Sequence, residues 1–379
     1  MSSVRSSHTR LAAARGPASA AALLDTSADL RHRFAAARQA GQRHRDAAAS
    51  LGLSEGEAVA LHSAAAGVPE HTAGLRSVRL RGPWLDLLRA LEPCGALMAL
   101  TRNDVAVHEK TGSYTGLAAQ GPVALALGDD IDLRLFFQHW TAGYAVHEPA
   151  RAGGGAPTLS LQFFDAQGSA VHKIYPRPAT DLACWQQVAQ DYADPVGTLP
   201  AFTPPPVPEP APDDDGVDVA AFGQAWAGLH DTHEFHGLLK QHRLEREQAL
   251  RLMAGRFTQR LPTDALRRLL HGAAAAGQPI MVFVGNPGCI QIHTGPVRRI
   301  EVMGPWLNVL DDGFNLHVRQ DQLASAWAVD KPTDDGTVSS LELFDAQRRL
   351  VLQCFGARKP GQPESEGWRQ LLQAVKAGR

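Results

Sequence analysis

The chain has 379 residues, which at about 150 residues per domain is enough for two or three domains with their own cores. Its 37 Lys and Arg residues are balanced by 39 Asp and Glu residues, so bulk charge attracts neither nucleic acid nor anionic lipid. No run of about 18 uncharged apolar residues occurs, and we therefore expect no nucleic-acid partner and no membrane insertion.

Residues 1–25 scatter arginines among Ala and Ser and lack the compact apolar core of a secretory signal. We expect them to form a disordered N-terminal extension of a cytoplasmic protein. The four cysteines lie far apart and form no CxxC pair, which argues against a disulfide framework and a zinc knuckle and predicts a reducing compartment. They are Cys94, Cys184, Cys289 and Cys354.

Residues 194–217 read DPVGTLPAFTPPPVPEPAPDDDGV, which is too rich in proline for a sheet and predicts an extended linker. Two blocks of similar length flank it, 26–193 and 218–379. A shift of 183 places the segment 98–103 on 281–286, and after a slip of three residues a shift of 180 places 164–167 on 344–347. The sequence therefore predicts a tandem duplication of a whole domain.

In chain order, the second copy changes from helical to strand-like patterns. Residues 219–253 have apolar positions at helical spacing and a break near His242, which predicts two helices. Residues 280–355 alternate in short β-branched runs, and residues 364–376 again have one apolar side. We expect α+β copies, each with a large antiparallel sheet and flanking helices, and a cleft where sheet and helices meet.

Residues 222–240 carry a stripe that steps by three or four residues, as one side of a single helix would. Its members are Phe222, Trp226, Leu229, His233, His236 and Lys240. The pattern places two imidazoles on the face that should be buried. At the same shift the first copy has Ser50 and Leu53, so any histidine site belongs to the second copy only.

Three interpretations of this stripe remain open from the residues themselves. The histidines are satisfied core residues; or an imidazole binds haem iron while the aromatic and aliphatic side chains cover the macrocycle; or zinc is held by His230, His233 and His236 with Asp231 or Glu234. The apolar flank favours haem over a bare ion.

Several long motifs resemble one family, the bacterial haemin-degrading and haemin-transport proteins of the HemS, ChuS and PhuS type. They are Asp231-Thr-His-Glu-Phe-His236, Ile280-Met-Val-Phe-Val-Gly-Asn286, Gly288-Cys-Ile-Gln291, Trp306-Leu-Asn308, Lys331-Pro-Thr333 and Ser340-Leu-Glu-Leu-Phe344. The resemblance extends over nearly the whole chain after residue 28, including the duplication.

The resemblance implies that haem b is held in a cleft that uses residues of both halves. His233 matches the axial iron ligand, and Arg134 of the first half matches an arginine on the opposite haem face. Lys331 and Arg358 match basic residues near the propionates, and Gln353 matches a polar pocket residue.

Two positions depart from the family pattern. Phe355 stands where some members have tyrosine, and His236 resembles the subset that exchanges the iron between neighbouring histidines. His108 matches a position proposed as a second ligand in some members, and we expect it to be structural.

The resemblance implies a cytoplasmic protein that receives haem from an inner-membrane importer and passes it to a haem oxygenase. The alternative is an enzyme that opens the porphyrin ring with oxygen and a reductant. The sequence does not decide whether the protein only carries haem or also degrades it.

Overall fold

The computed structural model describes residues 20–63, 74–150, 156–194, 196–207, 209–210, 212–359 and 361–378. Helix α1 (Ala20–Gln39) begins inside the predicted N-terminal extension, of which residues 1–19 lie outside the described residues. Within the described ranges, no helix combines the length and the apolarity needed to cross a membrane.

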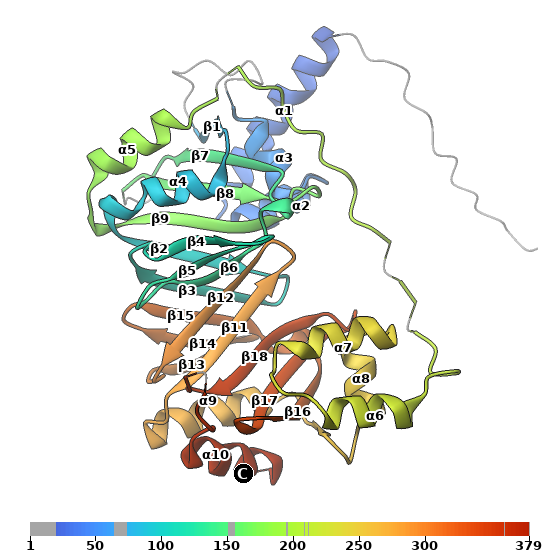
Figure 1. The fold of residues 1–379 in the computed structure, drawn as a ribbon. Helices are drawn as coiled ribbons and strands as arrows, with labels where there is room; N and C mark the ends of the chain where they lie inside the picture. The colour runs from blue at the N-terminus through green and yellow to red at the C-terminus, as the bar shows by residue number, and fades with distance from the viewer. Residues whose placement is uncertain are drawn as a thin grey trace, which may run out of the picture.

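Sheet A has nine antiparallel strands and contains strands of both halves of the chain (Figure 1). Their order is β1 (Arg76–Leu80), β7 (Ala142–Glu148), β8 (Thr158–Phe164), β9 (Ala170–Thr180), β2 (Gly95–Arg102), β3 (Ala106–Gly112), β15 (Phe314–Arg319), β14 (Trp306–Asp311) and β13 (Ile300–Met303).

Sheet B repeats this arrangement with the roles of the halves reversed. Its order is β10 (Thr258–Leu261), β16 (Leu323–Thr333), β17 (Gly336–Asp345), β18 (Leu350–Gly356), β11 (Ile280–Asn286), β12 (Cys289–Gly295), β6 (Asp132–Leu135), β5 (Val123–Leu127) and β4 (Leu117–Gln120). The α+β duplication is thus confirmed, but each half gives three strands to the other half's sheet, which the sequence comparison did not predict.

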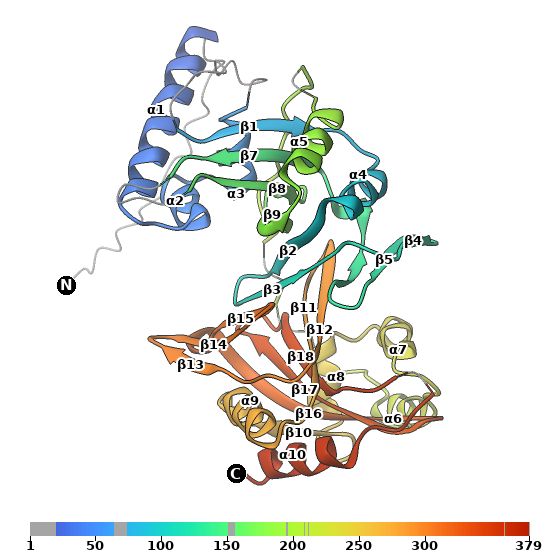
Figure 2. The ribbon, with the colours of Figure 1, turned by 90° about the vertical axis from the view of Figure 1, so that its left-hand side faces the viewer.

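The two sheets cross at their centres, where equivalent asparagines connect the halves. Asn103 donates to the carbonyls of Gly285 (3.1 Å) and Val351 (2.8 Å). Asn286 donates to the carbonyls of Arg102 (2.9 Å) and Val171 (2.8 Å). The same amide bonds therefore recur at both repeat positions and fix the crossing. Figure 2 shows the first half above this crossing and most of the second half below it.

Helices cover the sheets in equivalent pairs. Helices α4 (Trp84–Ala90) and α5 (Leu182–Asp191) pack on the inner side of sheet A, and α9 (Ala265–Ala276) and α10 (Glu366–Lys376) pack on the inner side of sheet B. The outer face of sheet A carries α1, α2 (His44–Ser50) and α3 (Glu55–Ala60), and that of sheet B carries α6 (Val219–Ala227), α7 (Glu234–His242) and α8 (Arg246–Leu252). Short turns lie at η2 (Glu92–Cys94), η3 (Phe137–His139) and η4 (Gln320–Gln322).

Local sequence explains where several helices begin and end. Ser54 and Glu57 form a reciprocal capping box at α3, and the side chains of Asp181 and Ser365 accept the first N–H groups of α5 and α10. Helix α10 buries Trp368, as its apolar side predicted. Helix α9 ends at Gly277, whose φ of 59° favours glycine.

One sequence-based prediction about cysteine is wrong. Cys94 of η2 and Cys184 of α5 form a disulfide, with their Cα atoms 5.2 Å apart although 90 residues separate them in sequence. Spacing along the chain did not reveal the pair, because η2 and α5 pack together only in the folded domain. Cys289 and Cys354 are buried and free. The disulfide removes the argument for a reducing compartment that rested on the cysteines.

The described residues of the Pro-rich segment 194–217 form neither helix nor strand. In Figure 1 this segment runs down one side of the molecule from the first half to the second. Side-chain bonds hold it at its far end, where Gln248 donates to the Asp213 carbonyl and Arg251 pairs with Asp214.

Candidate functional site

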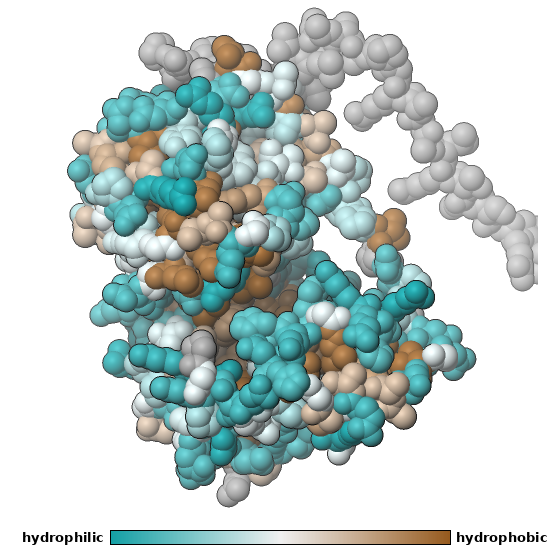
Figure 3. Space-filling view, viewed as in Figure 1, coloured by the Kyte–Doolittle hydropathy of each residue, from teal (hydrophilic) through white to brown (hydrophobic). Residues whose placement is uncertain are grey.

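The outer face of sheet B carries a strip of half-buried apolar side chains that no helix fully covers. Strand register places Phe283 beside Gln353, and Ile290 beside Arg134, on this face. Leu125 lies opposite Arg134 on the next strand, and Leu127 near the strand end is 55% exposed. Figure 3 shows hydrophobic side chains gathered over β4–β6 and a hollow between these strands and α7. Contiguous apolar surface of this kind is typical of a binding site.

The predicted single helix through the histidine stripe is wrong, because the chain breaks between Gly228 and His233. Helix α6 ends at Ala227, and the Glu234 carboxylate accepts the backbone N–H groups of His230 (2.8 Å) and Asp231 (3.3 Å). These bonds begin α7 as a new helix. The expected break near His242 is present, where Arg243 has a φ of 55°, so the segment forms three helices instead of two.

The break separates the stripe into a buried part and an exposed part. Phe222, Trp226 and Leu229 are buried, as the sequence predicted. The His233 side chain is 92% exposed, and His236 is also exposed. The prediction that both imidazoles occupy a buried face is therefore wrong. They border the apolar strip instead of lying beneath α7.

Asp231 fixes the orientation of the His233 ring. Its Oδ1 accepts the backbone N–H of His233 (2.7 Å) and lies 2.6 Å from the ring Nδ1. A carboxylate on Nδ1 sets the tautomer, so Nε2 carries a free lone pair and becomes a better metal ligand. The hydrogen bonds from His233, together with the nearby charge of Arg358, hold the pKa of Asp231 below its ordinary value, so the carboxylate is ionised at neutral pH.

His230 and His236 have different surroundings. His230 Nδ1 lies 3.0 Å from Asp334, which connects the α6–α7 loop to the β16–β17 turn. Partial desolvation and the nearby charges of Lys240 and Arg246 lower the pKa of His236. Its ring is therefore mostly neutral at neutral pH, the form that binds a metal.

The Lys331 ammonium lies near one aromatic ring of α7 and one of the apolar strip, so the start of α7 is close to this strip. Lys331 Nζ is 4.8 Å from the ring centre of Phe235, two residues after His233, and 5.9 Å from that of Phe355. Phe355 in turn packs edge-on against Phe283 at 5.2 Å. His233 therefore lies at the margin of the sheet face that carries Phe355, Phe283 and Gln353.

A buried carboxylate beneath this face organises the cations around it. Glu342 accepts two bonds from Arg246 (2.6 and 2.8 Å), one from Lys331 (3.0 Å) and one from Gln353 (2.9 Å). Although burial alone would raise it, these cations hold the pKa of Glu342 far below its ordinary value. Glu342 and Arg246 are not among the site residues predicted from the sequence. One charged residue in the apolar run of β17 was the available signal.

This network bears on the predicted role of Lys331. The side chain is 2% exposed and its ammonium is bonded to Glu342, so the structure places it under the candidate site and not on its surface. Its role toward propionates stays a prediction. Gln353 donates to the same carboxylate and lies at the sheet surface beside Phe283.

Two arginines flank the strip. Arg134 is in β6, comes from the first half, and pairs with its neighbour Asp132. Arg358 pairs with Asp335 at 3.1 Å and is close enough to influence the Asp231 carboxylate. The structure thus brings His233, Phe355, Gln353 and both arginines to one side of sheet B.

The zinc alternative is not supported by this arrangement. In the part of the chain that the structure describes, no three His, Cys, Asp or Glu side chains form a group suitable for a metal ion. His108 is fully buried in the layer between the sheets, 5.0 Å from the Phe314 ring, and therefore does not reach the strip.

Comparison with known proteins decides the family. The model of the haemin-degrading HemS.ChuX domain matches residues 52–192 and again residues 243–375. The chain belongs to the HemS family. Its two matches correspond to the two halves of the duplicated fold.

Relatives of the HemS family align over most of their length. The hemin transport protein HmuS of Yersinia pestis is 36% identical over 89% of this chain and 94% of its own. The heme-binding protein PhuS of Pseudomonas aeruginosa, in its holo crystal structure, is 42% identical with a TM-score of 0.83, covering 94% of this chain and 99% of its own. The heme degrading enzyme ChuS of Escherichia coli O157:H7 is 33% identical with a TM-score of 0.82, covering 92% and 99%.

Proposed function

We propose that this protein binds haem with the His233 imidazole as the iron ligand and hands the haem to an acceptor protein. The observation that carries the proposal is the exposed His233 ring, held at Nδ1 by Asp231 and placed at the margin of an apolar sheet face. HemS-family relatives named as a hemin transport protein and a heme-binding protein support haem as the cargo.

The residues present fit a flat, apolar macrocycle with two acidic side chains. Phe283 and Phe355 offer aromatic surface, and burying such surface releases about 25 cal/mol per Å². Arg358 is our candidate partner for a propionate, since arginine binds carboxylates in bidentate fashion. Lys331 supports the site from below through Glu342.

Arg134 gives a reason for the exchange of strands between the halves. Because β6 pairs with β12, a guanidinium of the first half lies on the same sheet face as the ligand-bearing half. We propose that Arg134 contacts the haem face opposite His233. One bound molecule would then engage both halves, although the first half has Ser50 and Leu53 at the positions of His233 and His236.

His236 offers a route for release. It lies one turn after His233, and one turn of helix displaces the ligand by about 5 Å. Its neutral ring is available as a second ligand. We propose that iron passes from His233 to His236 as the macrocycle moves out toward the acceptor.

Haem titration of histidine variants tests the ligand assignment. We expect His233→Ala to weaken haemin binding by about tenfold or more and to shift the Soret band, because the iron loses its ordered ligand. His236→Ala should bind haemin nearly normally and release it more slowly to a haem oxygenase. His271→Ala, an exposed histidine of α9, is the control. Unchanged spectra and transfer in the double variant of His233 and His236 would falsify the proposal.

The Asp231 carboxylate provides an independent test. Asp231→Asn leaves an amide that no longer favours the same tautomer of His233, and we expect haem affinity to fall by about tenfold to a hundredfold. Asp213→Asn is the matched control, because Asp213 is exposed and also accepts a backbone N–H two residues on, outside the site. Equal affinities in the two variants would show that Asp231 does not position the ligand.

Opening of the porphyrin ring is the alternative function, as the description of ChuS as a heme degrading enzyme suggests. Product analysis with oxygen, a reductant and catalase separates the two functions, because catalase removes the peroxide that degrades haem without an enzyme. Unmodified haem under these conditions supports transport, and a ring-opened product supports the enzyme. Action in the cytoplasm, next to an inner-membrane importer, belongs to the same proposal, and cell fractionation tests it.

A further inference from the structure

The outer face of sheet A has a cavity of about 840 Å³, which is large enough for a small metabolite. Both halves line it: α2, the end of β2 and the β2–β3 turn from the first half, and β14, β15, η4 and the β17–β18 turn from the second. Through the duplication, this outer face of sheet A is equivalent to the outer face of sheet B, where we propose that haem binds. The two sites are on different sheets, so this inference does not depend on the proposed function.

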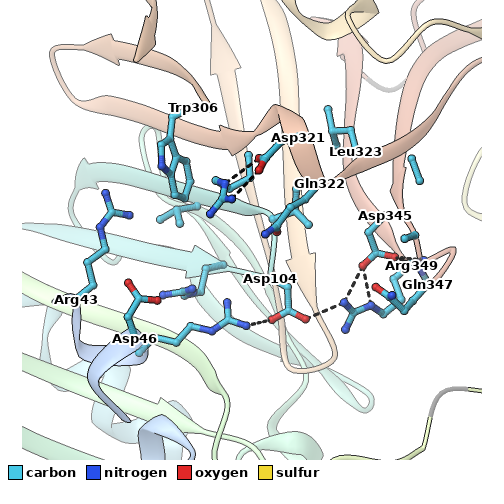
Figure 4. A pocket seen from close by; sticks show the side chains of 17 residues that line it. Arg43, Asp46, Asp104, Trp306, Asp321, Gln322, Leu323, Asp345, Gln347 and Arg349 are labelled. Carbon is cyan, nitrogen blue, oxygen red and sulfur yellow. Dashed lines mark hydrogen bonds and ion pairs between the residues drawn. The ribbon is translucent and has the colours of Figure 1, made fainter. Parts of the chain in front are cut away.

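The cavity lining is unusually rich in arginine. Five of its residues are arginines, namely Arg43, Arg45, Arg102, Arg319 and Arg349, and four are aspartates, namely Asp46, Asp104, Asp321 and Asp345. In Figure 4, Trp306 and Asp321 lie on one side of the view and Asp104 on the other, with the Gln322 side chain between Asp321 and Asp104.

Three of the arginines are already paired with carboxylates. Arg45 and Arg349 both bind Asp104, and Arg349 also binds Asp345 at 2.7 Å. Arg319 forms a two-point pair with Asp321 (2.8 and 2.7 Å). These pairs connect α2 to the turns of the second half, so a structural role accounts for them.

Arg43 and Arg102 remain, and no structural role of this kind accounts for them. Within the described residues, neither guanidinium has a carboxylate oxygen within 4.0 Å, while Arg43 lies 5.0 Å from the Trp306 ring centre. Burial lowers the pKa of Arg102, and the charge of Arg45 adds to this shift, although the charges of Glu55, Asp104 and Asp46 act against it. A half-buried guanidinium without an ion pair is costly, and an anion in the cavity would offset that cost.

We propose that this cavity binds a small molecule with at least two oxyanion groups, either phosphates or carboxylates, through Arg43 and Arg102. Arg43 and Arg102 supply N–H donors in the fork geometry that suits both groups. The Trp306 ring, which also has the Arg319 guanidinium 5.4 Å from its centre, forms one wall beside the ligand. Among the described residues Asp46 forms no ion pair within 4.0 Å, and although its charge acts on Arg102 and Arg319, it limits the affinity by repulsion.

Calorimetric titration of the full-length protein with pyrophosphate and, separately, with citrate tests the proposal. We expect at least one to bind with one-to-one stoichiometry, and which one binds identifies the phosphate or the carboxylate source. Arg102→Gln and Arg43→Gln should each weaken binding by about tenfold, the loss expected for one charge-assisted contact. Asp46→Asn should strengthen it, and added salt should weaken it.

Arg298→Gln is the matched control, because it removes one exposed arginine charge outside the cavity. Arg43 is exposed, so its variant keeps the test valid if replacement of the half-buried Arg102 unfolds the chain. Specific binding is supported if affinity falls in the cavity variants and not in Arg298→Gln. Binding of neither anion, or equal binding by Arg298→Gln and Arg43→Gln, overturns the proposal.

Discussion

The two outer sheet faces share one scaffold and differ in chemistry. On sheet B a helix start presents His233 at the margin of the face that carries Phe355 and Gln353, whereas at the duplicated positions sheet A has Ser50, Tyr175 and Lys173. The surface of one face is apolar with an imidazole at its margin, and that of the other is lined by arginines. Duplication thus preserved the strands, while a few side chains and one loop make the surfaces of the two faces different.

Each face also has a buried glutamate that contacts basic side chains. Glu342 binds Arg246 and Lys331 under the proposed haem face, and Glu55 of α3 lies 2.5 Å from Lys173 and 3.4 Å from His44 under the other. The carboxylate comes from a strand in one half and from a helix in the other. The network is therefore similar in kind without being aligned in sequence.

The largest expected effect comes from removing the carboxylate of the second half. Glu342→Gln leaves Arg246 and Lys331 as uncompensated charges, and we expect the free energy of unfolding to fall by about 3–5 kcal/mol. Urea denaturation measures this loss, with the exposed Glu366→Gln as control. If both variants were equally stable, Glu342 would not be the centre of a network that supports this face.

Histidines buried between the two sheets predict that acid destabilises the fold. Burial lowers the pKa of His172 to about 3, and burial together with the charge of Lys110 does the same for His293. Unfolded histidine has a pKa of about 6.5, so these rings stabilise the fold fully above that pH. Below pH 6.5 each buried ring lowers the free energy of unfolding by about 1.4 kcal/mol per pH unit, until the pH approaches 3.

Denaturation midpoints between neutral pH and about pH 5 check this slope. His293→Phe keeps an aromatic ring against Phe314, which stacks on His293 at 3.7 Å, and should reduce the slope by one proton. His139→Gln changes an exposed histidine and should leave the slope unchanged. A pH-independent midpoint in the wild type would show that the buried rings do not carry the acid sensitivity.

The smallest expected effect tests whether the imidazole alone defines the difference between the faces. Ser50→His places a histidine at the duplicated position of His233, in a face whose described residues form no equivalent of the Asp231 loop or the apolar strip. We expect one haem per chain, as in the wild type, by haemin titration. A second equivalent of bound haem would show that a histidine is sufficient to convert the face.

The sequence predicted the architecture better than the site. Matches between the two blocks identified the duplication. Apolar alternation identified the strands, because it reflects which side of each strand is buried. Helical spacing could not show that Gly228 and the Glu234 carboxylate interrupt the stripe, since that depends on side-chain bonds to the backbone. Exchange of strands and the Cys94–Cys184 pair are contacts between distant segments, which a single sequence does not encode in any local pattern.

His233, Arg134 and Arg358 lie on one side of sheet B, and their contact with haem is a proposal. Lys331 shows the limit of reading charge from sequence. From the sequence alone, a lysine in a strand is expected to be exposed to solvent. Here Lys331 is buried because it pairs with Glu342, which is 11 residues away on the neighbouring strand.

The exchange of three strands affects what happens when the chain is cleaved between the two halves. A protease that cuts the proline-rich connection would produce two fragments that are still held together by the β3–β15 and β12–β6 ladders. Neither fragment alone would retain a complete sheet, because each would leave with three strands that belong to the other. Each copy is therefore needed to complete both sheets, even though His233 lies in only one of them.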